Sequence, residues 1–270
     1  MRFRSSSPES RKLVLLAPPE SKVPEFFTRI DSDRSRYESL FAEMQSVRGR
    51  IYLQDGAIEP WQLTDGRHQL GIDQASWHLL VMDKADRVSG CARYREYPND
   101  TSFSELSVSQ SALARCAEWG PRLEAAVESE LALARHLDLP YVELGGWALV
   151  EQIRGTAEAL RMALVTYCLA QGLGGGVGIS TVTRRYCSAS ILRRIGGRSL
   201  EHGGSELPPY YDPQYKCEME VLRFYSWAPN PRYSGWIDEI RSQLQAIPVL
   251  SAGTRLPNLQ PASYLRPTFA

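Results

Sequence analysis

The spacing of apolar residues predicts a helix in the first fifth of the chain. Four apolar residues share one helical face: Tyr37, Leu40, Phe41 and Met44. They recur at intervals of three and four residues, the period of an amphipathic helix. Ser32 or Asp33 precedes this run and is expected to cap the helix. The sequence RIYLQ at 50–54 then reads as a strand.

Later patterns alternate between the strand period and the helix period. Strands are expected at 76–83, 87–97, 141–149, 176–183 and 216–225, and helices at 121–137, 157–171, 184–196 and 234–247. The first two strands form a tight hairpin, and a βαβα unit follows. This order predicts an α/β (α+β) fold with antiparallel strands first.

The ends of the chain differ from its middle in composition. Residues 1–24 are rich in Ser, Pro and charge, which predicts a poorly ordered N-terminal arm. Residues 25–225 hold the predicted strands and most helices, which predicts one domain. Residues 226–270 combine one predicted helix with a Pro-rich tail, expected to be loose or draped over the core.

Charge and cysteine content exclude several function classes. Lys+Arg and Asp+Glu number 31 each, so no global field favours nucleic acid or a membrane surface. The five cysteines lack CxxC spacing and the four histidines lack ligand spacing, so we expect no bound metal and a reducing cytoplasm. No apolar run approaches the roughly 20 residues of a membrane helix, so no span is expected.

A glycine turn separates the predicted strand 141–149 from the helix at 157–171. Gln152, Gly155 and Ala157 mark this turn. A helix N-terminus offers unpaired N–H groups and a partial positive charge, and glycine lets an anion approach the backbone closely. The turn is therefore a candidate phosphate site, with plain architecture as the alternative. It has neither the lysine of a Walker loop nor a full GxGxxG pattern.

The order of elements around this turn resembles the GCN5-related N-acetyltransferase (GNAT) superfamily, over roughly residues 35–225. In that family a Q/R-x-x-G-x-G/A turn binds the pyrophosphate of a pantetheine thioester. The resemblance implies a mixed, splayed central β-sheet flanked by helices, with donor contacts from two consecutive segments. These are Trp147, Ala148 and Leu149 on the strand, and Gln152, Ile153, Arg154, Gly155, Thr156 and Ala157 in the turn.

A narrower resemblance concerns the stretch DGRHQLGIDQASWHLLVMDKADRVSGCARY. It is similar to the front half of autoinducer (acyl-homoserine-lactone) synthases and of long-chain N-acyl amino acid synthases, with matches at Asp73, Gly90, Arg93 and Glu143. Lactone synthases usually follow the glutamate with x-Ser-Arg, whereas this chain has Leu-Gly-Gly. The departure favours the acyl-amino-acid branch and implies that Asp73 and Arg93 bind the acceptor.

The chemistry of acyl transfer to an amine assigns the remaining roles. Glu143 is expected to be the base for the amine; the alternative is a strand residue that is solvated or ion-paired, for example with Arg93. Arg93 itself either binds an acceptor carboxylate or forms a structural salt bridge. Backbone N–H groups near Trp147 to Leu149 are expected to stabilise the oxyanion, freed by a bulge at Gly145-Gly146.

Two side chains of the helix region 184–196 complete the candidate set. Tyr186 lies near the family's usual tyrosine on the helix after the strand, which implies that it protonates the leaving thiolate; the alternative is a half-buried aromatic anchor. Cys187, beside it, is expected to be a small buried hydrophobe. Apolar residues that line either an acyl channel or plain core are Trp77, Leu79, Trp147 and Leu149.

An excess of arginine in the second half of the chain bears on the donor. Arg154 and Arg161 suit phosphates of any source. A wider patch of positive charge suits the acidic surface of an acyl carrier protein, so this donor is favoured here over acyl-CoA. The patch consists of Arg184, Arg185, Arg193, Arg194 and Arg198. A solvated helix face is the alternative, and RNA is disfavoured because interleaved aromatics are missing.

The sequence therefore predicts an acyltransferase that moves a medium or long acyl group from a pantetheine thioester to the amine of an amino acid or similar metabolite. An autoinducer synthase and a short-chain acetyltransferase that uses acetyl-CoA are the enzymatic alternatives. A non-catalytic module that binds acyl carrier protein is the alternative of another class.

Overall fold

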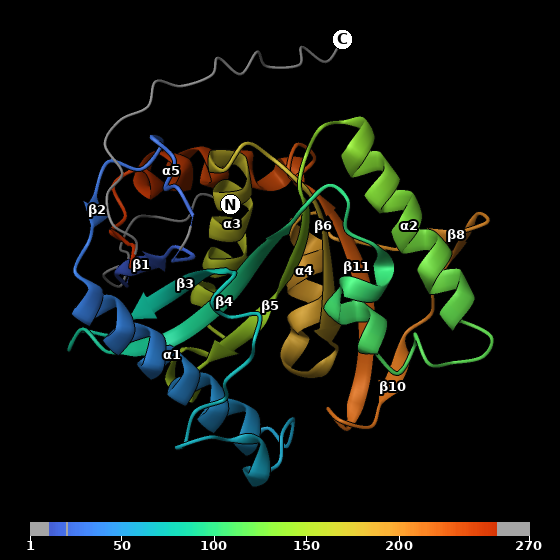
Figure 1. Cartoon of the computed structure of the whole chain (residues 1–270), viewed down its shortest axis with the longest axis horizontal. Helices are drawn as coiled ribbons and strands as arrows, with labels where there is room; N and C mark the ends of the chain where they lie inside the picture. The colour runs from blue at the N-terminus through green and yellow to red at the C-terminus, as the bar shows by residue number, and fades with distance from the viewer. Residues whose placement is uncertain (1–10, 20, 253–270) are drawn as a thin grey trace.

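The computed structural model describes residues 11–19 and 21–252, which build one large mixed sheet (Figure 1). Its strands run, in spatial order, β10 (Tyr210–Asp212), β11 (Cys217–Tyr225), β6 (Val177–Thr183), β5 (Tyr141–Leu149), β4 (Val88–Tyr97), β3 (Trp77–Met82), β1 (Leu13–Leu16), β12 (Val249–Leu250) and β2 (Ile30–Asp31). The short β7 (Arg198–Ser199) also pairs with β11, and β8 (Glu201–His202) pairs with β9 (Ser205–Glu206) outside the sheet.

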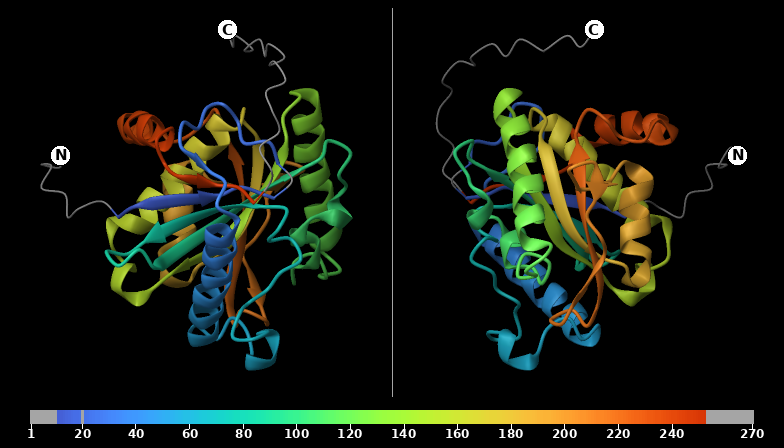
Figure 2. Two further views of the ribbon diagram at one scale, coloured as in Figure 1. Left: turned by 60° about the vertical axis from the view of Figure 1, so that its left-hand side comes forward. Right: turned by 90° about the vertical axis from the view of Figure 1, so that its right-hand side faces the viewer.

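Helices cover both faces of the sheet (Figure 2). α1 (Arg34–Gln54) and α2 (Gly120–His136) pack on one face, and α3 (Ala157–Gly172), α4 (Ser188–Ile195) and α5 (Ser234–Leu244) on the other. Each face of the sheet therefore has its own hydrophobic core. Strand β1 contributes to both: Val14 and Leu16 pack with α1 on one face, and Leu13 and Leu15 pack with α3 on the other. Short 3-10 helices connect these elements: η1 (Pro60–Gln62), η2 (Phe103–Glu105), η3 (Ser107–Gln110), η4 (Glu151–Ile153), η5 (Arg185–Cys187) and η6 (Pro231–Tyr233).

Most predicted elements are confirmed, but the strand predicted at 50–54 is wrong. The helix capped by Asp33 continues through these residues as the last turns of α1. Met44, Val47 and Ile51 are all buried and continue one helical face. Tertiary contacts of that face therefore override the local preference of Ile51-Tyr52-Leu53 for a strand.

The prediction of a poorly ordered arm is wrong for Leu13–Leu16. These residues form β1, which is fully buried between β3 and β12. Four consecutive apolar side chains suit a strand with a core on each face. The predicted helix in the C-terminal segment is confirmed as α5, after which β12 pairs in parallel with β1. The rest of the predicted tail, 253–270, lies outside the described residues, as do residues 1–10.

The central sheet is splayed between β5 and β6, as the resemblance implied. These parallel strands pair only over Tyr141–Leu144 and Val177–Ser180, although both continue further. On the other side of β5, Arg93 lies opposite Gly145 and Cys91 lies opposite Ala148, so β5 has one extra residue there. Gly146 takes φ +61 in this bulge, a conformation that glycine adopts without strain. The predicted bulge at the glycine pair is thus confirmed.

Candidate active site

A cleft of about 1000 Å³ opens where β5 and β6 diverge. Its apolar wall comes from α3 and α4: Leu160, Met162, Ala163, Ile191 and Leu192. A polar wall across from it includes Tyr52, Arg93, Glu143 and Tyr215. Trp147 and Leu149 also line the cleft, whereas Trp77 and Leu79 lie in the core. One cavity therefore joins an apolar region to a charged one along the free edge of β5.

The glycine turn lies at the N-terminus of α3 beside this cleft. Gly155 takes φ +71, and a Cβ at this position would meet nothing within 4 Å. Thr156 is the N-cap, and its side chain accepts a hydrogen bond from the Glu158 amide. Arg154, Gly155, Thr156 and Ala157 all line the cleft. The turn thus presents open backbone at the positive end of a 16-residue helix.

Two residues of the predicted donor site lie away from the cleft. Ile153 is 1 % exposed, packs in the core, and donates its N–H to the Val150 carbonyl at 3.0 Å. Gln152 is exposed but does not line the cleft. The candidate phosphate site is therefore the segment 154–157, which begins two residues after Gln152, where the matched pattern begins.

Arg154 contacts a carboxylate that the sequence analysis did not identify. Its two terminal nitrogens donate to the two Asp55 carboxylate oxygens, at 2.9 and 2.7 Å. Asp55 is the C-cap of α1, 99 residues away in the sequence. The Arg154 guanidinium also lies over the Tyr186 ring, 4.7 Å from its centroid. The cation nearest the glycine turn is therefore held by a bidentate pair and a ring.

Tyr186 lies at the rim of the cleft in an unusual backbone conformation. It and Cys187 have φ values of 54 and 60, although neither is glycine. The Tyr186 side chain is 60 % exposed and its hydroxyl lies 3.3 Å from an Asp55 oxygen, so it is not the half-buried anchor offered as an alternative. Cys187 is exposed at the cleft, so the expectation of a buried hydrophobe is wrong.

Glu143 is buried on β5 and accepts three hydrogen bonds. The donors are the Tyr97 hydroxyl and the amides of Ser107 and Val108, each amide at 3.0 Å. Burial raises the pKa of Tyr97, and the Glu143 carboxylate raises it further, so the phenol remains a donor. These three hydrogen bonds leave one of the about four lone-pair sites of the carboxylate for a ligand or a water. The ion pair formed by Arg93 is with Asp73, not with Glu143.

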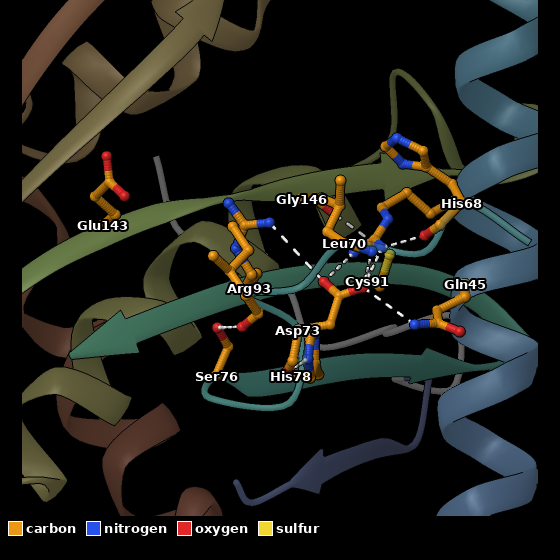
Figure 3. A network of polar contacts seen from close by, with 12 residues as sticks. Gln45, His68, Leu70, Asp73, Ser76, His78, Cys91, Arg93, Glu143 and Gly146 are labelled. Carbon is orange, nitrogen blue, oxygen red and sulfur yellow. Dashed lines mark hydrogen bonds and ion pairs between the residues drawn. The ribbon is translucent and has the colours of Figure 1, made fainter. Parts of the chain in front are cut away.

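Arg48 and Asp73 form a fully buried ion pair behind the polar wall. Figure 3 shows Asp73 with Gln45 and Arg93 on either side. Arg48 donates to both Asp73 oxygens, at 2.9 and 2.6 Å, and Gln45 adds a third hydrogen bond. Burial favours the protonated form of Asp73, but the hydrogen bonds and charge of Arg48 outweigh it and lower its pKa. Burial lowers the pKa of His78 to about 4, so this ring is neutral at pH 7.

Arg93 is a second guanidinium beside the same carboxylate. Its nearest Asp73 contact is long, 3.9 Å, because Arg48 occupies both oxygens. Its side chain is 8 % exposed and lines the cleft, and its Nε has no hydrogen-bond partner among the described residues. Figure 3 shows it between Asp73 and Glu143. Two arginines share one carboxylate, so this wall retains positive charge for an anionic group of a ligand.

The predicted carrier-protein patch is partly neutralised. Arg184 pairs with Glu218 and Glu220 at 2.9 and 3.2 Å, and Arg193 pairs with Glu220 at 2.7 Å. Arg185 donates to backbone carbonyls, and Arg161 pairs with Glu158. Arg194 and Arg198 are exposed. The acidic partners lie on β11, far from the patch in sequence, so a charge count along the chain did not reveal them.

Three residues of the site were missed by the sequence analysis: Asp55 and Tyr215, which line the cleft, and Arg48, which lies behind its polar wall. Arg48 follows Met44 on the apolar face of α1, and an arginine at that position signals a buried partner. Burial raises the pKa of Tyr215, which the charge of Arg93 partly opposes. Neither Asp55 nor Tyr215 has a local signal in the sequence.

The described residues contain no group of three or more potential metal ligands. None of the described helices is both long and apolar enough to cross a membrane.

Several solved structures resemble this chain at low sequence identity. BjaI, a CoA-dependent acyl-homoserine lactone synthase solved with SAM and isopentyl-CoA, matches with a TM-score of 0.52 and 16 % identity, covering 91 % of this chain and 95 % of its own. MesI, also a CoA-dependent acyl-homoserine lactone synthase, gives a TM-score of 0.49 and 14 % identity, with 88 % and 98 % covered. FeeM, an N-acyl amino acid synthase from uncultured soil microbes, gives a TM-score of 0.46 and 11 % identity; the match covers 79 % of this chain and 91 % of FeeM.

No protein-family model and no curated protein matches the sequence. The structural match to BjaI confirms the predicted mixed, splayed fold.

Proposed function

We propose that this protein is an N-acyltransferase that transfers an acyl group from a pantetheine thioester to the amine of an amino acid or a related metabolite. The observation that carries the proposal is the single cleft in which the free edge of β5, the open glycine turn of α3 and an apolar wall meet. A free strand edge binds an amide-containing arm, a helix N-terminus binds phosphate, and apolar side chains bind an acyl chain.

The donor is the first part of the proposal. Acyl-CoA and acyl carrier protein share phosphopantetheine, so segment 154–157 serves either. Salt bridges reduce the free charge of the arginine patch, which supports acyl-CoA as the first donor to test. BjaI is described as CoA-dependent, and FeeM as an N-acyl amino acid synthase. An acyl carrier protein remains the second donor to test.

The reaction exchanges a carbon–sulfur bond for a carbon–nitrogen bond. The amine nitrogen attacks the thioester carbonyl, whose oxygen then bears negative charge near the free edge of β5 between Trp147 and Leu149. Collapse of this intermediate expels the pantetheine thiolate. The amine proton leaves toward the Glu143 carboxylate, directly or through water, and the Tyr186 hydroxyl supplies a proton to the thiolate.

Replacing Glu143 tests the proposed base. We expect Glu143→Gln to lower kcat about 100-fold at neutral pH, the usual range for loss of a general base. Tyr97→Phe is the matched control, because it removes one hydrogen bond to the carboxylate but keeps its charge. It should retain most of kcat. Steady-state kinetics with a saturating donor measures both variants. Equal losses would mean that the hydrogen-bond network around Glu143, rather than proton transfer to its carboxylate, sets kcat.

Arg93 is proposed to bind the carboxylate of the acceptor. We expect Arg93→Gln to raise the acceptor KM about 10- to 100-fold, since a charge-assisted hydrogen bond contributes about 1.5–3 kcal/mol. The decarboxylated amine of the same amino acid is the control acceptor. Wild-type protein should prefer the amino acid and the variant should lose that preference. An unchanged ratio of kcat/KM for the two acceptors would place the acceptor carboxylate elsewhere.

The alternatives differ in their products. An autoinducer synthase acylates SAM and releases a lactone together with methylthioadenosine, a short-chain acetyltransferase accepts acetyl-CoA in preference to longer donors, and a binding module releases no thiol. The masses of the products from each donor, with SAM or an amino acid as acceptor, separate these functions. BjaI is described with SAM, so SAM belongs in the acceptor set.

A further inference from the structure

Four residues form a clasp at the rim of the cleft: Asp55, Arg154, Arg185 and Tyr186. The Asp55 carboxylate accepts both Arg154 hydrogen bonds, at 2.9 and 2.7 Å, and lies 3.3 Å from the Tyr186 hydroxyl. The Asp55 carbonyl accepts a hydrogen bond from Arg185. Asp55 is therefore the common partner of the other three residues.

The clasp connects the two strands that diverge around the cleft. Arg154 follows β5, and Arg185 and Tyr186 follow β6. Asp55 reaches them from the C-terminal end of α1, a third element. All four residues line the cleft, so the clasp crosses its rim beside the open Gly155 turn. A donor whose phosphates occupy the α3 N-terminus meets this carboxylate directly.

The turn that carries Tyr186 is held in a strained state. Two consecutive non-glycine residues, Tyr186 and Cys187, have positive φ, a conformation that side chains with a Cβ rarely adopt. The Arg154 guanidinium covers the Tyr186 ring at 4.7 Å, and Arg185 donates to Tyr215 and Lys216 carbonyls. These contacts hold the turn of Tyr186 in its positive-φ conformation. Loss of the contact between Asp55 and Arg154 would therefore remove part of that support.

We propose that Asp55 is a positioning residue that occupies Arg154 in the donor-free protein and is displaced by a phosphate of the donor. A guanidinium binds carboxylate and phosphate through the same bidentate geometry, so the two anions compete for one partner. The inference rests on the proposed function, because it takes the donor to be a phosphorylated pantetheine.

The turn of α1 that carries Asp55 also borders the acceptor side of the cleft. Tyr52, one turn earlier on α1, lines the polar wall and donates to the Trp147 carbonyl at 3.5 Å. The carboxylate that pairs with Arg154 therefore lies at the end of the helix that also contacts β5.

Binding of coenzyme A and of pantetheine, measured by titration calorimetry on the full chain, tests the inference. Asp55→Asn keeps the shape and backbone contacts of Asp55 but removes its charge. It should bind coenzyme A about threefold to tenfold more tightly than wild type, the scale of a partly exposed bidentate pair. Binding of pantetheine, which has no phosphate, should be unchanged.

Glu59→Gln is the matched control, since it removes another acidic partner, that of Lys216, from the same loop region. It should leave coenzyme A affinity unchanged.

The binding results separate failure of the inference about Asp55 from failure of the proposed function. Unchanged or weaker coenzyme A binding by Asp55→Asn overturns the inference, as does equal tightening by Glu59→Gln. Wild-type protein that binds neither coenzyme A nor pantetheine overturns the proposed function itself. Coenzyme A binding with no effect of Asp55→Asn leaves that function standing and removes only the role of Asp55.

Discussion

Gly155→Asp should raise the donor KM about 100-fold while the protein stays folded. Gly155 has φ +71, which aspartate tolerates better than most residues, and its Cβ would enter open space. The new carboxylate would then lie where the donor phosphate binds. Two like charges about 4 Å apart repel by about 4 kcal/mol at an effective dielectric constant of 20, which solvent screening reduces.

Gly155→Asn is the control that separates charge from shape. Asparagine has the same size and the same tolerance of positive φ, so it adds bulk without a charge. We expect its donor KM to rise only about tenfold. Calorimetric binding of coenzyme A should follow the same order. Equal effects of the two substitutions would mean that no phosphate binds at this turn.

The second large effect concerns stability. Asp73→Asn should lower the free energy of unfolding by about 3–5 kcal/mol, because it leaves Arg48 fully buried without its counter-charge. The free energy of unfolding of a typical domain is about 5–15 kcal/mol, so this loss is a large fraction of the whole stability. Urea denaturation measures it. Asp86→Asn, which breaks an exposed pair with Lys12, should cost less than about 1 kcal/mol.

The difference in unfolding free energy between wild type and Asp73→Asn should depend on pH in one direction. The folded-state pKa of Asp73 lies below its ordinary value, so its ion pair stabilises the protein at all pH values above about 4. The stabilisation is lost only as pH falls through the depressed folded-state pKa. The gap between wild type and Asp73→Asn should therefore be constant from pH 5 to 8. A small gap at pH 7 would contradict the assignment of Asp73 as the counter-ion of Arg48.

The sequence predicted the elements whose signals are local. Strand β5 and its bulge were predicted because the paired glycines interrupt an apolar run, and Gly146 does take the conformation that only glycine adopts freely. The hairpin β3–β4 and helix α3 were predicted from periodicity and turn residues. These features depend on neighbours within a few positions in the chain.

Features that depend on distant partners were not predicted. Strand β1 has only four apolar residues between polar segments, and its partners β3 and β12 lie far along the chain. Asp55 and Arg154 are 99 residues apart, and Asp55 looks like an ordinary residue at the end of a helix. Asp73 was proposed through a resemblance, whereas its counter-ion Arg48 emerged only from the packing of α1 against the polar wall.

Product analysis tests the central claim most directly. Wild-type protein is incubated with medium- and long-chain acyl-CoA, or with the same acyl groups on acyl carrier protein, and a pool of amino acids. Mass spectrometry should detect an N-acyl amino acid together with one equivalent of free pantetheine thiol, and Gly155→Asp should form far less of both at subsaturating donor. The absence of any acyl amide with either donor, in protein that binds coenzyme A, would contradict the proposed acyltransferase function.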